Sequence, residues 1–314
     1  MKRPAVVFFA AVILCLVVCV PADAAKLAYI ETIRQFGDPP GTGKDTVKHH
    51  IRCLDLETGV SKLLHTVADR PYVIGPSWSS DGKLLAFSTA SEGWDKFRRF
   101  YTKDQEVFSF DIQTSSKPKF LKLFKRGIAC FTIIRSGELL YAAPEGDDIY
   151  GKGDVYLGNR LLLKRIQSVP TKIILSRDEK FYILLLPESE TAQERIAYCS
   201  VDKGILKIFN LGRDVCVQFV DLSPDGKKIL YDYGPYEGEE TTTHLYTIEV
   251  ATGKKKRLKL DTCRAFWDTS SSLITIDPRD SLSVVRRVDL NTGKSSKLAT
   301  IKAGLSGQMA YSPK

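Results

Sequence analysis

The segment PSWSSDGK at residues 76–83, followed by the apolar run LLAF at residues 84–87, determines the fold. It recurs as VDLSPDGK at residues 220–227, again before an apolar run. Asp-Gly between two apolar runs predicts a tight hairpin turn, because glycine readily adopts the positive φ that such a turn needs. Weaker copies of the turn occupy residues 135–138, 176–180 and 268–272. A turn that recurs along the chain predicts a repeat architecture.

A second turn alternates with the first. Its copies begin with an acidic residue, continue with an apolar and a variable residue, and end in Thr and Gly or Ser; they lie at residues 55–59, 111–115, 249–253 and 289–293. Degenerate copies lie at residues 157–159 and 202–204. Each repeat therefore carries four short strands, A to D, joined by an A–B turn, a B–C loop and a C–D turn. Four-stranded units of about 40 to 45 residues are typical of β-propeller blades, so six copies predict six blades.

The two ends of the chain each hold half of the remaining blade. Residues 309–314 match the front of the first turn motif, and residues 26–30 match the strand that follows it. We therefore expect an all-β fold, a six-bladed β-propeller over residues 25–314 that is closed by pairing of the N- and C-terminal strands. Such closure removes the free sheet edges that would invite aggregation.

The N-terminus has the features of an export signal. The chain has 314 residues, 43% hydrophobic and 26% charged, with a formal net charge of +9, which is typical of a globular protein. Lys2 and Arg3 precede an apolar run at residues 5–20, and Ala22-Asp23-Ala24 supplies an A-x-A cleavage site. Residues 1–24 are thus predicted to be a signal peptide, which places the protein in the periplasm or outside the cell. An uncleaved anchor is the alternative; with cleavage, the protein is not integral to a membrane.

The cysteines of the remaining chain are odd in number and are expected to be small buried hydrophobes. They are Cys53, Cys130, Cys199, Cys216 and Cys263. An oxidising compartment would permit disulfides among them, and the sequence leaves open whether any forms. No C-x-x-C motif occurs, so neither a zinc knuckle nor a thioredoxin-like site is predicted.

The tandem W-S-x-D-G-K and S-P-D-G-K turns, with acidic T-G turns between them, resemble the WD-repeat-like propeller repeats of the TolB family. The resemblance covers the chain after the predicted signal. TolB proteins are periplasmic, carry an N-terminal α/β domain before the propeller, and bind a peptidoglycan-associated lipoprotein on a propeller face. The resemblance implies a non-catalytic interaction propeller whose partner is an envelope or extracellular protein. The extra α/β domain is expected to be absent here.

Sites for nucleotides, metals and other cofactors are not expected. Residues 38–45 (DPPGTGKD) nearly match a phosphate-binding loop, but Asp38 replaces its first Gly and Asp45 replaces its magnesium-binding Ser or Thr. The four histidines, His49, His50, His65 and His244, show no metal-ligand spacing. A propeller lyase acting on uronate oligosaccharides is the alternative function, with His50 and His244 each opening a strand C. Nucleic acid is not expected as a partner of an exported protein.

Partner binding is expected on the long B–C loops, the first of which is predicted at residues 31–48. In an up-and-down blade, the A–B and C–D turns share one end of the ring, called here the turn end, and the B–C and D–A connections share the other, the loop end. The second B–C loop, residues 91–106, carries aromatic and basic side chains that are typical of interface hot spots. The candidate partner-binding residues are Trp94, Lys96, Phe97, Arg98, Arg99 and Tyr101. The alternative is an insertion packed against its own blade.

Export should remove the segment that ends at Ala24. Mass spectrometry of the protein isolated from its native cells is expected to find Ala25 at the N-terminus, because signal peptidase cleaves after the A-x-A motif. A chain that retains Met1 in the membrane fraction would contradict this prediction and support the anchor.

Overall fold

The computed structural model describes residues 25–35, 46–68, 70, 72–94, 100–114, 117–145, 151–187, 193–213, 215–217, 219–235, 244–260, 262, 264–279, 282–302 and 305–312. In these ranges the chain forms 25 β-strands. They contain no helix long and apolar enough to cross a membrane. Residues 1–24, the segment at 38–45 and Cys263 lie outside the described ranges.

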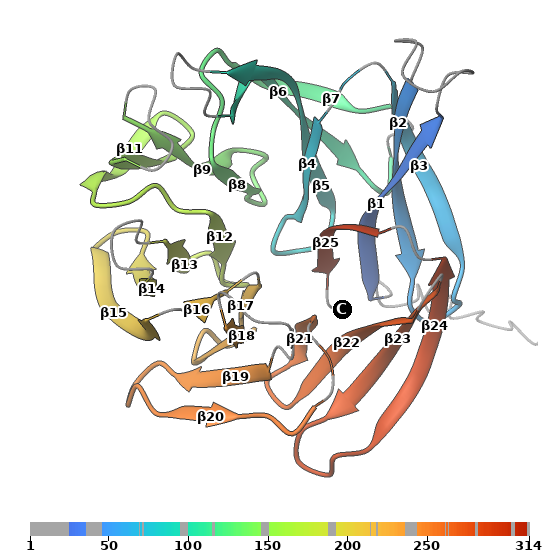
Figure 1. The fold of residues 1–314 in the computed structure, drawn as a ribbon, viewed down its shortest axis with the longest axis vertical. Coiled ribbons are helices and arrows are strands. Elements are labelled where there is room, and N and C mark those ends of the chain that lie inside the picture. Colours follow the sequence, from blue (N-terminus) through green and yellow to red (C-terminus); the bar gives the residue numbers. More distant parts are fainter. Residues whose placement is uncertain are drawn as a thin grey trace, which may run out of the picture.

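The strands form six antiparallel sheets arranged in a ring (Figure 1). With the inner strand first, blade 1 is β25 (Leu305–Ser312), β1 (Lys26–Gln35), β2 (Thr46–Asp55) and β3 (Ser61–Ala68). Blade 2 is β4 (Tyr72–Trp78), β5 (Leu84–Trp94), β6 (Phe100–Asp111) and β7 (Lys119–Phe124). Blade 3 is β8 (Cys130–Ile133), β9 (Leu139–Pro144), β10 (Gly153–Leu157) and β11 (Arg160–Ile166).

The second half of the chain completes the ring. Blade 4 is β12 (Lys172–Leu175), β13 (Phe181–Leu186), β14 (Gln193–Ser200) and β15 (Gly204–Arg213). In blade 5, β16 (Val215–Cys216) and β17 (Val220–Leu222) both pair with β18 (Lys228–Pro235), followed by β19 (His244–Glu249) and β20 (Lys255–Arg257). Blade 6 is β21 (Ala265–Thr269), β22 (Ser272–Arg279), β23 (Leu282–Asp289) and β24 (Ser295–Lys302). The prediction of an all-β, six-bladed propeller is confirmed.

The ring closes by pairing of the two chain ends, as predicted. Strand β25 is antiparallel to β1, with Lys26 opposite Ser312 and Tyr29 opposite Met309. Blade 2 also binds the closing strand β25, because the Trp78 indole N–H donates to the Ala310 carbonyl at 3.0 Å. Strand β25 is therefore integrated into blade 1 and also bound to blade 2.

Local chemistry explains why the two turn motifs recur. In the first A–B turn, Ser79 Oγ accepts the Leu84 N–H at 2.9 Å and donates to Asp81 Oδ1 at 2.7 Å, while Gly82 adopts φ 69°. In the C–D turns the leading Asp caps the chain: Asp289 Oδ1 accepts the N–H groups of Asn291 and Thr292 at 2.9 and 2.8 Å. The Thr292 N–H, followed by its hydroxyl, holds the pKa of Asp289 below its usual range. These bonds satisfy turn backbone groups that would otherwise need water.

The hydrophobic core lies between blades rather than at the centre of the ring. Ile51, Phe87 and Phe110 pack together where blades 1 and 2 meet, and Ile183 and Ile229 do so between blades 4 and 5. Removing this apolar surface from water is the main stabilising contribution, at roughly 25 cal/mol per Å². Each blade therefore depends on its neighbours for burial of both of its faces.

Three cysteines fit the predicted role. Cys53, Cys130 and Cys199 are buried free thiols, and burial raises the pKa of each, to about 11 for Cys53 and about 12 for Cys130 and Cys199. Neutral thiols of this kind behave as small hydrophobes and are poor nucleophiles. The Cys216 side chain lies outside the described part, as does Cys263, so the burial expected of these two cysteines stays a prediction.

Two of the predicted B–C loops are largely strand. In blade 1, β1 and β2 stay paired as far as Gln35 and Thr46, and in blade 2, β5 and β6 stay paired as far as Trp94 and Phe100. The expected loops at residues 31–48 and 91–106 are therefore wrong in their bounds. The loops were expected where the sequence becomes polar. A hairpin, however, continues for as long as its backbone groups pair, and it ends at turn-forming residues rather than at the first polar side chains.

Deleting residues 305–314 tests ring closure. The truncation leaves the inner edge of β1 unpaired and removes the partner of the Trp78 indole, so we expect insoluble protein or a loss of about 4 kcal/mol or more in the free energy of unfolding. Urea denaturation measures the loss, with the volume-conserving variant Met309→Leu as the control. Unchanged stability of the truncated protein would mean that the ring is closed in another way.

Candidate functional site

The blade 2 hairpin projects beyond the rest of its blade at the loop end. The inner strand β4 pairs with β5 only as far as Ala90, and the outer strand β7 reaches β6 only at Gln105. Beyond these points the described backbone pairs residues 91–94 with residues 100–103. We call this two-stranded extension the blade 2 ribbon.

The predicted partner-binding residues are on this ribbon or at its tip. Trp94 ends β5 opposite Phe100, and Tyr101 lies opposite Gly93, so the backbone brings Trp94 and Tyr101 to the same end of the hairpin. Their side chains, and all of Lys96, Phe97, Arg98 and Arg99, fall outside the described part of the chain. Their role in binding stays a prediction.

The base of the ribbon is firmly held. Gln105 is fully buried; its Nε2 donates to Ser88 Oγ and its Oε1 accepts the Ile128 N–H, both at 2.8 Å. Arg70 pairs with Glu106 at 2.7 Å. These contacts join β6 to β5 and to the connections before and after blade 2, so the ribbon rises from a fixed support.

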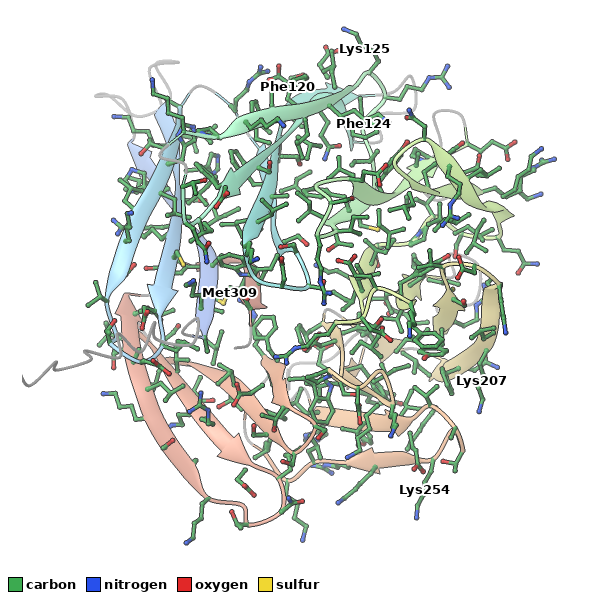
Figure 2. All side chains as sticks on the ribbon, turned by 180° about the vertical axis from the view of Figure 1, so that it is seen from behind. Phe120, Phe124, Lys125, Lys207, Lys254 and Met309 are labelled. Carbon is green, nitrogen blue, oxygen red and sulfur yellow. The ribbon has the colours of Figure 1, made fainter. Side chains whose placement is uncertain are left out.

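A cavity of about 570 Å³ occupies the centre of the ring. Every blade contributes to its wall through its inner strand, with Ser77, Thr132, Ile174, Asp221, Phe266 and Ala310 as examples. Each inner strand follows a D–A connection and leads into an A–B turn, so its first residues lie toward the loop end. Figure 2 shows Met309 of β25 beside this centre, whereas Phe120, Lys207 and Lys254 lie at the periphery.

Both carboxylates in the described part of the cavity wall accept hydrogen bonds from backbone N–H groups. Asp221 accepts the N–H of Leu222 at Oδ1 and the N–H of Trp267 at Oδ2, each at 2.8 Å. Asp232 is buried, and its Oδ1 accepts the Phe219 N–H at 2.7 Å. Burial, opposed by the two N–H donors, raises the pKa of Asp221 to about 7. These groups brace the inner strands of blades 5 and 6.

The loop end of the cavity combines cationic and aromatic groups. Lys172 is the first residue of β12 and is exposed, and Arg264 directly precedes β21 and is half-buried. Phe219 and Phe266 meet edge to face, with ring centroids 5.1 Å apart. All four residues line the cavity. Within the described residues, neither Lys172 nor Arg264 forms an ion pair.

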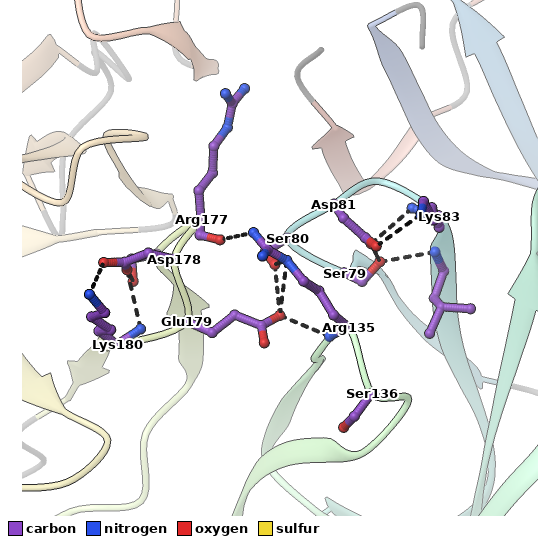
Figure 3. Close-up of polar contacts among 12 residues, drawn as sticks. Ser79, Ser80, Asp81, Lys83, Arg135, Ser136, Arg177, Asp178, Glu179 and Lys180 are labelled. Carbon is purple, nitrogen blue, oxygen red and sulfur yellow. Dashed lines mark hydrogen bonds and ion pairs between the residues drawn. The ribbon is translucent and has the colours of Figure 1, made fainter. Parts of the chain in front are cut away.

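At the turn end, a cluster of polar residues links blades 2, 3 and 4 by hydrogen bonds (Figure 3). Glu179 Oε1 accepts the Ser80 hydroxyl at 2.7 Å and the Arg135 backbone N–H at 2.8 Å. The Arg135 guanidinium in turn donates to Ser80 Oγ and to the Arg177 carbonyl. Glu179 has φ 60° in the turn position that Gly82 and Gly226 occupy, a strained conformation for a residue with a side chain. In Figure 3 the Arg177 side chain points away from this cluster.

The histidines do not converge. His49 bonds to Thr32 through Nδ1, and the adjacent His50 lies 3.6 Å from Glu31, which also pairs with Arg52. His50 is inside β2 and does not open it, which corrects the expectation; His244 does open β19, in blade 5, where it contacts Arg257. In the described part of the chain, no group of three or more His, Cys, Asp or Glu side chains could hold a metal ion.

Comparison of the sequence with protein-family models gives no match, and comparison with curated proteins gives none. Solved structures do resemble the chain. TolB from Acinetobacter baumannii superposes with a TM-score of 0.57 at 16% identity, over 92% of this chain and 67% of TolB. A candidate TolB from Agrobacterium tumefaciens gives a TM-score of 0.56 at 14% identity, over 93% of this chain and 100% of that one.

The fold is that of a TolB-type β-propeller. The resemblance suggested by the turn motifs is thus confirmed for the fold. A chain of the nidogen/laminin complex superposes almost as well, with a TM-score of 0.55 at 11% identity, over 93% of this chain and all of the other. At such identities the likeness concerns architecture, so the function must be argued from this chain's own surfaces.

Sequence reasoning missed the central cavity and its charged lining. The inner strands read GPSW, CFTI, KIIL and VDL, and Asp221 is the one acidic residue among these four segments. That isolated acid in a short buried strand was an available signal. The sequence does not say that Lys172 and Arg264, 92 positions apart, border the same space.

Stability should fall as the pH rises toward neutrality. Burial raises the pKa of Asp221 to about 7, and burial, opposed by the Val217 N–H and assisted by nearby Asp232, raises that of Glu194 to about 7. In the unfolded chain both ionise near pH 4. Between about pH 5 and 7 the folded protein therefore retains protons that the unfolded chain has lost, so the free energy of unfolding decreases as the pH rises.

Urea denaturation at a series of pH values measures this dependence. In the variant Asp221→Asn, the free energy of unfolding should change less between pH 5 and 7. The amide does not titrate, so any destabilisation that it causes is the same at every pH. A wild-type stability that increases from pH 5 to 7, or an unchanged slope in the variant, would contradict the assignment.

Proposed function

We propose that this chain is an exported, non-catalytic interaction module, a TolB-like propeller that acts in the periplasm or outside the cell. Its partner is an envelope or extracellular protein, and its working surface is the loop end of the ring. The fold comparison supports this class of protein, since rigid propellers commonly present variable connections at one end for binding.

The observation that carries the proposal is the blade 2 ribbon. A two-stranded hairpin is only marginally stable in water unless further strands or another surface cover it. In the described strands, residues 91–94 and 100–103 pair with each other, and the pairing of β4 and β7 ends at Ala90 and Gln105. A binding partner would supply that cover.

The composition of the tip supports the same use. Residues 94–101, WDKFRRFY, combine four aromatic and three basic residues. Aromatic and arginine side chains contribute much of the binding energy at protein interfaces. The fixed base at Gln105 anchors the hairpin on which these residues lie, which limits the backbone entropy lost on binding.

Site-specific crosslinking in the native cells tests the proposal. A photoreactive amino acid at Phe97 should give a discrete crosslinked protein, whereas the same probe at Phe120, an exposed aromatic on the outer strand of the same blade, should not. Purified proteins then give the energetics. Replacing Trp94, Phe97, Arg98 and Arg99 by Ala should lower the affinity for that protein by about 2 kcal/mol or more, with little change in melting temperature.

Two outcomes would refute this assignment. If the quadruple variant unfolds, the ribbon is packed structure, as the alternative in the sequence analysis holds. If it folds and binds as tightly as the variant Phe120→Ala, the working surface lies elsewhere on the ring.

A further inference from the structure

We propose that the central cavity binds a small organic anion, a carboxylate or phosphate ester with an apolar ring, which enters from the loop end between Lys172 and Arg264. This site is separate from the protein-binding ribbon. No step of the proposed function depends on it.

The distribution of hydrogen-bond partners favours an anion. The two wall carboxylates are committed to backbone N–H groups of Leu222, Trp267 and Phe219. Among the described residues, the ammonium of Lys172 and the guanidinium of Arg264 have no carboxylate partner. The two cationic groups at this mouth can therefore pair with an anionic ligand without breaking an existing ion pair, and hydrogen bonds from cationic groups to carboxylate or phosphate oxygens are strong.

The effect of Lys172 on the pKa of Cys130 supports placing the Lys172 ammonium near the cavity. Cys130 lines the same cavity from blade 3, and burial raises the pKa of its thiol to about 12, while the Lys172 ammonium acts in the opposite direction. An ammonium that influences this thiol is close to the inner wall. Its charge therefore acts on the cavity as well as on outside solvent.

The apolar part of the ligand has a defined place. Blade 5 stands between blades 4 and 6 in the ring, so its Phe219, packed on Phe266, lies between β12, which Lys172 opens, and β21, which Arg264 precedes. Aromatic walls with a few polar groups are typical of small-molecule pockets, and about 570 Å³ falls within their usual size. Lys172 opens β12 and Arg264 directly precedes β21, so both lie toward the loop end, and a ligand that reaches them enters from that side.

Two fluorescent probes of nearly the same shape test the charge requirement. Anilinonaphthalene sulfonate is an aromatic anion, and N-phenylnaphthylamine is its neutral counterpart. We expect the sulfonate to bind the native protein at one saturable site, and benzoate or phenyl phosphate to displace it. The better competitor identifies the head group that the site prefers.

Substitution places the probe in the cavity. The double variant Lys172→Gln and Arg264→Gln should weaken sulfonate binding about tenfold or more and leave binding of the neutral probe unchanged. The matched control, Lys254→Gln with Lys256→Gln, removes the same charge from exposed positions on or beside a C–D turn of the turn end and should change neither. If the double variant fails to fold, the exposed Lys172 is replaced alone.

The outcomes separate this site from the proposed function. Sulfonate affinity that is equal in the cavity variant and in the control variant would overturn the proposal, as would a failure of both competitors to displace the probe. Because the Phe97 crosslink depends on the ribbon, it should persist in the cavity variant. Loss of anion binding with an intact crosslink therefore supports the cavity site without bearing on the ribbon.

Discussion

Pairing between β25 and β1 is the interaction on which the rest of the structure depends. Six sheets that bury both faces against their neighbours leave two exposed faces unless the last blade meets the first. Here the two ends of the chain meet within blade 1, which takes its inner strand from the C-terminal end and its other three strands from the N-terminal end. The same strand brings Met309 and Ala310 to the cavity wall. A Cβ at residue 82 would overlap the Ser312 hydroxyl oxygen, so a side chain there would require that hydroxyl to rotate away. The closing strand thus contacts the first A–B turn.

Much of the fold could be predicted because its signals are local. Each Ser-x-Asp-Gly or Asp-x-x-Thr-Gly segment makes its own hydrogen bonds within five residues, as Ser79 does with Leu84 and Asp289 with Thr292. A motif that completes itself in this way can be recognised without knowing the rest of the chain. Counting such turns was enough to predict the blades, their strand order and the shared blade at the two ends. The buried state of Cys199 followed similarly from its apolar, strand-like neighbours.

The candidate sites were harder to predict because they depend on partners distant in sequence. Where β5 ends is decided by pairing with β6. Ser91 looked like the start of a loop, although the ladder resumes with Ser91 opposite Lys103 after an irregularity that follows Thr89. Whether Lys172 lies in solvent or beside a cavity depends on five other blades. Asp221 is a sharper example: its raised pKa comes from burial created by blade 6, whose Trp267 N–H it accepts. No local pattern carries that information.

The two ends of the ring differ physically, and this difference supports assigning function to one of them. At the turn end, short turns cap themselves and Glu179 ties blades 2, 3 and 4 together. The positive φ of Glu179 costs about 1 kcal/mol or more, a strain that glycine would have avoided, as it does at Gly226. Glycine, however, could not have made the two bonds from Glu179 Oε1. The backbone strain at Glu179 is therefore accompanied by side-chain hydrogen bonds that hold neighbouring blades together. At the loop end, the described contacts of Gln105 anchor the base of the ribbon, and Lys172 and Arg264 form no ion pair with a described residue, which supports the proposal that this end binds ligands.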